Sequence, residues 1–180
     1  MTDSNEPVVE FAHASKDQLK TIIEAFAQIT WPAPAEAADR LVAQLGWDRR
    51  NLRVARTNLP VEKNAATIGL ADGVEMLDVF RDLEFFVTDA VNGPGAERVL
   101  EMYRTMVRWV SEIAGPAVAS REPSPHPDAS PDFPTTWWEL PGGGGVRLFF
   151  IDDVVTMELT SKKTTDRYRF EREHPEYAEL

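Results

Sequence analysis

The stretch that decides the fold is residues 94–116, PGAERVLEMYRTMVRWVSEIAGP. Pro94 suits the first helical position, because its fixed φ and missing N–H cost nothing there. Gly115 followed by Pro116 ends the helix, since proline cannot continue it. Between them, apolar side chains recur at helical spacing, at Val99, Met102, Tyr103, Met106, Val110 and Ile113. We therefore predict a central helix over residues 94–114 with one buried face.

Two shorter helices are predicted ahead of it, as a helical hairpin over residues 15–46. Ser15 and Gln18 have the spacing of a capping box, which opens a helix. The prolines of Trp31-Pro32-Ala33-Pro34 end that helix, because residues before proline avoid the helical region. Gly46 is a natural end for the second helix.

Strands are predicted between the hairpin and the central helix, within residues 52–89. The candidate strands are Leu52–Asn58, Ala66–Leu70, Val74–Phe80 and Leu83–Thr88. Ala71-Asp72-Gly73 has turn composition and joins the second and third of them as a hairpin. In the last run Leu83, Phe85 and Val87 share one face, and Phe86 lies on the other. A phenylalanine there indicates that the second face of the sheet is also partly covered.

A second group of strands is predicted after the central helix, as a three-stranded meander over residues 135–160. Its strands and turns are Thr135–Leu140, Pro141–Gly145, Val146–Ile151, Asp152-Asp153 and Val154–Thr160. Residues 120–134 are rich in proline and predict a long exposed loop. Residues 161–180 are mostly polar and predict a tail that is either a frayed helix or irregular.

This order predicts a single α+β domain over residues 1–180. It has a mainly antiparallel sheet of about six to seven strands, with the helix over residues 94–114 packed across it.

The charge balance limits the partners. The chain has 19 basic and 30 acidic residues, a net charge of −11. Nucleic acid and anionic membranes would be repelled, whereas a basic protein would be attracted. The chain has no cysteine, which excludes disulfides and thiolate chemistry. Residues 1–14 lack the basic start of a signal peptide, so we expect a cytoplasmic protein.

No stretch has the pattern of a catalytic or metal site. The glycines Gly142–Gly145 are not followed by the Gly-Lys-Ser/Thr of a phosphate-binding loop. The three histidines, His13, His126 and His174, do not have metal-ligand spacing. Asp152-Asp153 and the pair Asp82 and Glu84 are better explained by turns and solvated faces than by acid–base catalysis. We therefore predict no catalytic residue, no metal and no cofactor, and a protein that is not an enzyme.

Two passages carry a resemblance that spans roughly residues 15–160. They are the Trp31-Pro32 segment leading to Leu45-Gly46-Trp47, and the Gly115-Pro116 stop followed by Trp137-Trp138, a glycine loop and a Val-x-Leu strand. Together they resemble a family of small actinobacterial proteins of unknown function. Proteins of this kind look like immunity factors of exported toxins, the nearest being that of a secreted NAD-glycohydrolase necrotizing toxin. The resemblance implies a non-enzymatic inhibitor that occludes the active site of a toxin, and it transfers no inhibitory residue.

Our functional hypothesis is an immunity protein, or antitoxin, that forms a heterodimer with its cognate toxin. The residues predicted to contact the partner are Glu62, Asn64, Asp72, Trp138, Asp152 and Asp153. The alternative is an acidic secretion chaperone, which would bind an extended effector segment and form a homodimer. An enzyme acting on a small molecule is the third hypothesis, and it requires a deep pocket lined by ionisable groups with shifted pKa values.

Overall fold

The computed structural model describes residues 10–71, 79–121 and 133–177 of the chain. The helices in these ranges are α1 (Lys16–Ala27), α2 (Glu36–Gln44), α3 (Ala96–Ala114) and α4 (Lys162–Glu173), with 3-10 turns at Gly93–Gly95 and Pro175–Tyr177. The strands are β1 (Asp48–Asn51), β2 (Val54–Arg56), β3 (Ala65–Ala71), β4 (Val79–Phe86), β5 (Ala119–Arg121), β6 (Thr135–Glu139), β7 (Gly145–Ile151) and β8 (Val154–Thr160).

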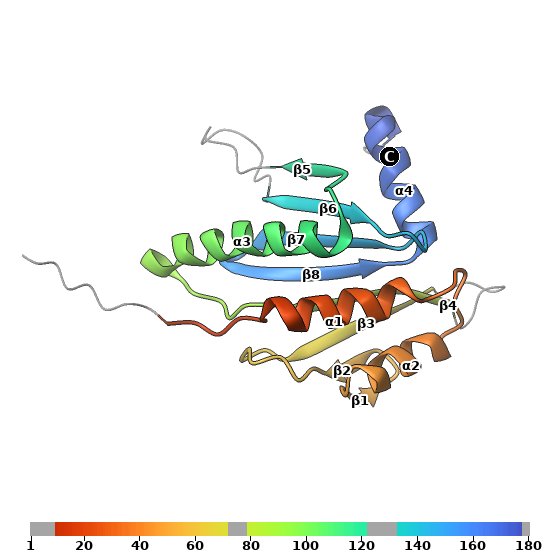
Figure 1. Cartoon of the computed structure of the whole chain (residues 1–180), viewed down its shortest axis with the longest axis horizontal. Helices are drawn as coiled ribbons and strands as arrows, with labels where there is room; N and C mark the ends of the chain where they lie inside the picture. Colours follow the sequence, from red (N-terminus) through yellow and green to blue (C-terminus); the bar gives the residue numbers. More distant parts are fainter. Residues whose placement is uncertain (1–9, 72–78, 122–132, 178–180) are drawn as a thin grey trace, which may run out of the picture.

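All the described strands belong to one antiparallel sheet. Its order is β1-β2-β3-β4-β8-β7-β6-β5, so the two predicted groups of strands meet where β4 pairs with β8 (Figure 1). The chain is therefore α+β, as predicted. The sheet has eight strands, slightly more than the sequence predicts.

The N-terminal helical hairpin is confirmed, together with its capping box. The Ser15 side chain accepts a hydrogen bond from the Gln18 backbone N–H, and the Gln18 side chain accepts one from the Ser15 N–H. This satisfies two backbone donors that the first turn of a helix leaves without partners. Leu19, Ile22, Ile23 and Phe26 then form the buried stripe of α1.

The central helix crosses the sheet as predicted. It contacts β6, β7 and β8 on one side and α1 on the other, so α1 and α3 lie side by side on the same face (Figure 1). The helix begins at Ala96 rather than Pro94, because Gly93–Gly95 forms a 3-10 turn first. It ends at Gly115, whose φ of +93° suits glycine.

Two predicted strand boundaries are wrong. Residues 52–58 were expected to form one strand, but the chain turns back between β1 and β2 because the Asn51 side chain accepts a hydrogen bond from the Arg53 N–H (2.8 Å). The break expected between Phe80 and Leu83 does not occur, since β4 runs through Asp82 and pairs with β3 and β8 there. Residues 72–78, which include most of the predicted turn and strand, lie outside the described ranges.

The second half of the sheet follows the prediction, with two additions. The meander β6-β7-β8 is confirmed, and both Asp152 and Asp153 have positive φ angles (49° and 58°), as a tight hairpin turn requires. The short strand β5 pairs with β6 at the start of the predicted loop, most of which (residues 122–132) lies outside the described ranges. In the tail, Lys162–Glu173 forms a regular helix with Ser161 as its N-cap.

The two faces of the sheet are covered differently. Helices α1, α2 and α3 pack on one face, and α4 lies over one end of the other, which we call the open face. Neighbouring strand residues point to opposite faces. Trp138 accordingly donates to Ser111 of α3 (3.1 Å), while Trp137 packs against Tyr168 of α4. The open face is formed by Asp82, Glu84, Phe86, Trp137, Glu139, Arg147, Phe149, Ile151, Thr156, Glu158 and Thr160.

Candidate functional site

A row of charged side chains crosses the middle of the open face. The strand register places Glu84 of β4 beside Glu158 of β8, and Glu158 beside Arg147 of β7. Arg147 Nη2 lies 2.6 Å from Glu158 Oε2, and the Glu158 side chain is only 9% exposed. Burial raises the pKa of Glu158, the Arg147 charge opposes that rise, and the charges of Asp82 and Glu84 add to it. Burial of the charged Glu158 side chain beside other carboxylates is therefore unfavourable, and the Arg147 guanidinium partly offsets this cost.

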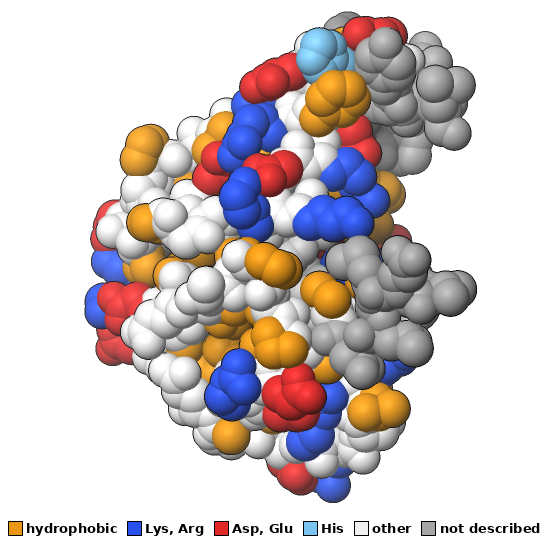
Figure 2. Space-filling model, turned by 90° about the vertical axis from the view of Figure 1, so that its right-hand side faces the viewer, with side chains coloured by type: hydrophobic (Ala, Val, Ile, Leu, Met, Phe, Trp, Pro, Cys, Tyr) orange, Lys and Arg blue, Asp and Glu red, His pale blue; other side chains and the backbone are white. Residues whose placement is uncertain are grey.

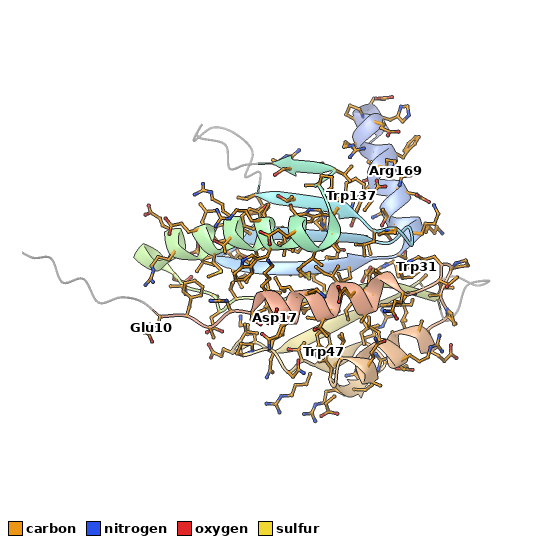
Figure 3. All side chains as sticks on the ribbon, viewed as in Figure 1. Glu10, Asp17, Trp31, Trp47, Trp137 and Arg169 are labelled. Atoms are coloured by element: carbon orange, nitrogen blue, oxygen red, sulfur yellow. The ribbon has the colours of Figure 1, made fainter. Side chains whose placement is uncertain are left out.

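Helix α4 covers one end of this row. Arg169 reaches back to Glu139 of β6 with two hydrogen bonds (2.9 and 2.6 Å), and Trp137 and Arg169 lie at the same end of the molecule (Figure 3). Tyr168 packs edge-on against Trp137 and lies over the Arg147 guanidinium. Burial and then the Glu158 charge raise the pKa of Tyr168. Aromatic and arginine side chains therefore cover this end of the open face.

A groove of about 340 Å³ opens at the other end of the open face. Its floor is mainly apolar and comes from three neighbouring strands, with Phe86 on β4, Val154 and Thr156 on β8, and Phe149 and Ile151 on β7. Its rim carries four carboxylates, Glu62, Glu84, Asp89 and Asp152, and one cation, Lys63. We call this site the acidic groove.

The rim of the acidic groove is held by backbone contacts. Asp89 accepts hydrogen bonds from the Glu62 N–H (2.6 Å) and the Ala12 N–H (3.0 Å), which ties two distant segments to the end of β4. Lys63 Nζ lies 5.9 Å from the centroid of the Phe86 ring. Asp152 is held by the turn between β7 and β8. The site is therefore assembled from groups whose positions the fold sets.

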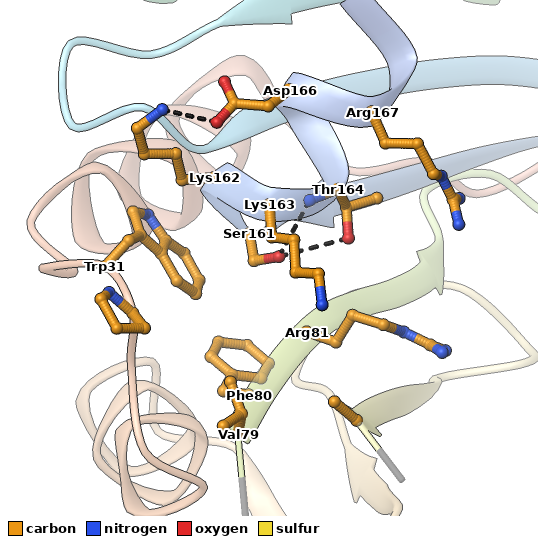
Figure 4. Close-up of a pocket in the computed structure, with 12 residues that line it drawn as sticks. Trp31, Val79, Phe80, Arg81, Ser161, Lys162, Lys163, Thr164, Asp166 and Arg167 are labelled. Carbon is orange, nitrogen blue, oxygen red and sulfur yellow. Dashed lines mark hydrogen bonds and ion pairs between the residues drawn. The ribbon is translucent and has the colours of Figure 1, made fainter. Parts of the chain in front are cut away.

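A larger cleft of about 580 Å³ lies at the opposite end of β4 (Figure 4). It is bounded by the segment that joins α1 to α2, by the first residues of β4 and by the first turns of α4. Four basic residues line it, Arg81, Lys162, Lys163 and Arg167, together with one acid, Asp166. Figure 2 views the molecule from this end, where Lys and Arg side chains gather next to hydrophobic ones. We call this site the cationic cleft.

Residues 17–161, most of the chain, match a known protein family. The chain belongs to the family of unknown function DUF6301. The DUF6301 match covers every described strand and, except for Lys16, the helices α1, α2 and α3, and it ends one residue before α4. No curated protein and no solved structure matches the chain. The resemblance drawn from the sequence is thereby confirmed as far as a family of unknown function.

The predicted contact residues of this DUF6301 chain fall in different places. Glu62 and Asp152, far apart in the sequence, both line the acidic groove. Asn64 and Asp153 are close to them in the chain but do not line it; their backbone carbonyls accept from the Thr57 and Val91 N–H groups. Asp72 lies outside the described residues.

The prediction that Trp138 contacts the partner is wrong. Its side chain is 0% exposed and packs under α3, so the indole forms part of the core and does not reach the surface. Its neighbour Trp137 faces the other way but is also buried, at 6% exposure, beneath α4. Neither tryptophan is therefore a surface anchor in this DUF6301 chain.

The structure adds Glu84 and Asp89 to the site. Glu84 shares a face of β4 with Asp82, as strand alternation requires, and that alternation was the available signal. Nothing local in the sequence marked Asp89 or the cationic cleft. Among the residues described for this DUF6301 chain, no three His, Asp or Glu side chains are grouped closely enough to hold a metal ion. None of the described helices is long and apolar enough to cross a bilayer.

Proposed function

We propose that this protein is a cytoplasmic immunity protein that binds a cognate exported toxin and occludes its active site, without catalysing a reaction. The observation that carries the proposal is the acidic groove, where four carboxylates surround an apolar floor and are opposed by one lysine. Such a site suits a Lys or Arg side chain of a partner, whose alkyl stem packs on the floor while its charge meets the rim.

The shape of the site supports a protein partner. At about 340 Å³ the groove accommodates one or two side chains, and the strands around it provide further surface for a protein partner. A buried anchor surrounded by a polar rim is the usual arrangement of binding energy in such interfaces. The net charge of −11 would speed encounter with a basic partner.

The experiment is a titration of the product of the neighbouring gene, tested as the candidate toxin, with NAD hydrolysis as the readout for a glycohydrolase. We expect stoichiometric inhibition by the wild-type protein. The triple variant Glu62→Gln, Glu84→Gln, Asp152→Asn removes three negative charges with little change in the shape of the groove, and it should weaken inhibition by about tenfold or more.

A matched control triple, Glu24→Gln, Glu101→Gln, Glu112→Gln, removes the same charge from exposed positions on α1 and α3. It should inhibit as the wild type does. Unaltered toxin activity at a saturating concentration of the wild-type protein would reject the immunity role, and equal losses in both triples would reject the groove as its site.

The order of elements favours a second candidate, an acidic secretion chaperone. Two helices, a run of strands, a third helix and further strands follow one another in the described residues, an order similar to the helix, strands, helix and strands of small chaperones of this class. Light scattering coupled to size-exclusion chromatography separates the two proposals. A stable homodimer that binds only an extended effector segment supports the chaperone, and a monomer that forms a heterodimer with a folded toxin supports the immunity protein.

A further inference from the structure

The cationic cleft has an apolar wall that the core holds in place. Phe80 is fully buried, and its ring centroid lies 5.9 Å from that of Trp31, with 32° between the ring planes. Trp31 packs in turn against Phe26 of α1 (5.5 Å). Pro32 and Val79 complete this side of the cleft. Because both rings are fixed by helix and sheet contacts, the wall needs no rearrangement to receive an apolar group.

The opposite side of the cleft carries positive charge. Lys162 pairs with Asp166 (2.6 Å), Arg81 with Asp82 (2.5 Å) and Arg167 with Glu171 (3.4 Å). Lys163 forms no ion pair with any residue that the structure describes, and its side chain extends from α4 toward β4 near Phe80 and Arg81 (Figure 4). Within the described residues, no carboxylate forms an ion pair with this ammonium group, which lies at the edge of the apolar wall.

We propose that the cationic cleft binds a small amphipathic carboxylate, of the kind represented by a medium-chain fatty acid. Its carboxylate would lie at Lys163, near Arg81 and Arg167, and its chain would lie along Trp31, Pro32 and Val79, which the buried Phe80 ring supports from behind. The cleft volume of about 580 Å³ is within the range of small-molecule sites. The described residues that line this cleft are mainly basic, whereas those of the acidic groove are mainly acidic, so the two sites favour different ligands.

This site is independent of the proposed immunity role. The cleft uses Val79, Phe80 and Arg81 at the start of β4, whereas the acidic groove uses Glu84 and Phe86 at its end. Binding of the carboxylate requires only the full chain without a partner. Failure of carboxylate binding would therefore not count against the immunity role, and failure of toxin inhibition would not count against carboxylate binding.

The test is isothermal titration of the full-length protein with decanoate below its micelle concentration. We expect saturable binding with one site per chain and no binding of acetate, which lacks the chain, or of decyltrimethylammonium, which has the opposite charge. Lys163→Glu should weaken decanoate binding by about tenfold, the value of one charged hydrogen bond. The control Lys20→Glu reverses an exposed lysine on α1 and should bind as the wild type does.

A second variant tests the apolar wall. Val79→Asn keeps the size of a half-buried residue but makes it polar, and it should weaken decanoate binding while circular dichroism shows an unchanged fold. Equal binding of decanoate and the alkyl ammonium, or an unchanged affinity in Lys163→Glu, would overturn the proposal. Absence of saturable decanoate binding to the wild type would also overturn it.

Discussion

Arg147 and Glu158 form a 2.6 Å ion pair between adjacent strands, on the face of the sheet that the central helix does not cover. The pair is flanked by Glu84 on the next strand and by the rings of Phe149 and Tyr168. Burial makes the charged form of Glu158 costly despite its partner, which is why its pKa is raised. This relationship makes the stability of the protein depend on pH in a definite direction.

We predict that Glu158→Gln removes a pH dependence from the free energy of unfolding. As pH rises from the ordinary carboxyl value of 4.5 toward the raised pKa of Glu158, the unfolded chain loses its proton first, so the wild type loses stability. The stability of the wild type minus that of the variant should fall across this window, by about 1.4 kcal/mol for each unit of the pKa difference.

Urea unfolding at several pH values across that window measures this difference. Glu24→Gln, at an exposed position on α1, is the control and should leave the slope of the wild type unchanged. A difference between wild type and Glu158→Gln that stays constant or rises with pH would show that Arg147 fully compensates the buried charge.

We predict that Gly145→Ala destabilises the protein. A Cβ at this position would lie 2.8 Å from the hydroxyl oxygens of both Thr160 and Thr165, and 2.9 Å from Trp137 Nε1. Both threonines are fully buried and bonded to each other (3.0 Å), so they have little room to move. Overpacking of this kind costs about 1–3 kcal/mol, which chemical denaturation measures. An unchanged midpoint would mean that α4 shifts readily away from the sheet.

We predict that Trp138 supports the core and not the partner. Trp138→Phe removes the hydrogen bond to Ser111 and leaves a small cavity under α3, so it should cost about 1–3 kcal/mol of stability. Ser111→Ala removes the acceptor alone and should cost about 1 kcal/mol. Both folded variants should inhibit the toxin as the wild type does. Weaker inhibition by Trp138→Phe at unchanged stability would restore the surface role that the sequence predicts.

Some helices of this chain are predicted by local sequence patterns, whereas α4 is positioned by contacts with residues distant in the sequence. The capping box at Ser15 and the apolar spacing of α3 are local patterns, and both helices form where these patterns lie. Helix α4 has no apolar stripe: it is attached through Tyr168, Arg169 and Arg172, whose partners Trp137 and Glu139 come from β6. The sequence therefore allows either a frayed helix or an irregular tail here.

The candidate site depends even more on non-local contacts. Glu62 and Asp152 were predicted as acidic loop residues, but their convergence follows from the sheet order β3-β4-β8-β7, which no local pattern specifies. The cationic cleft joins Trp31, Phe80 and Lys163 from three distant segments. Residues of this kind become a site only once the strand order is known.

In the turn between β7 and β8, we expect one residue to affect both stability and binding and its neighbour to affect stability alone. Asp152 and Asp153 both have positive φ angles, which asparagine and glycine tolerate better than aspartate does. Only Asp152 lines the acidic groove. Asp153→Gly should therefore raise the free energy of unfolding by about 0.5–1 kcal/mol and leave toxin inhibition unchanged. Asp152→Asn should maintain or raise stability and weaken inhibition.

The double variant Asp152→Asn, Asp153→Gly creates the turn sequence that such hairpins prefer. We expect it to be more stable than the wild type in urea and a poorer inhibitor in the toxin titration. That combination, higher stability with lower function, is expected where a residue is kept for binding at some cost to the fold. Inhibition by the double variant equal to that of the wild type would show that the Asp152 carboxylate serves the turn alone.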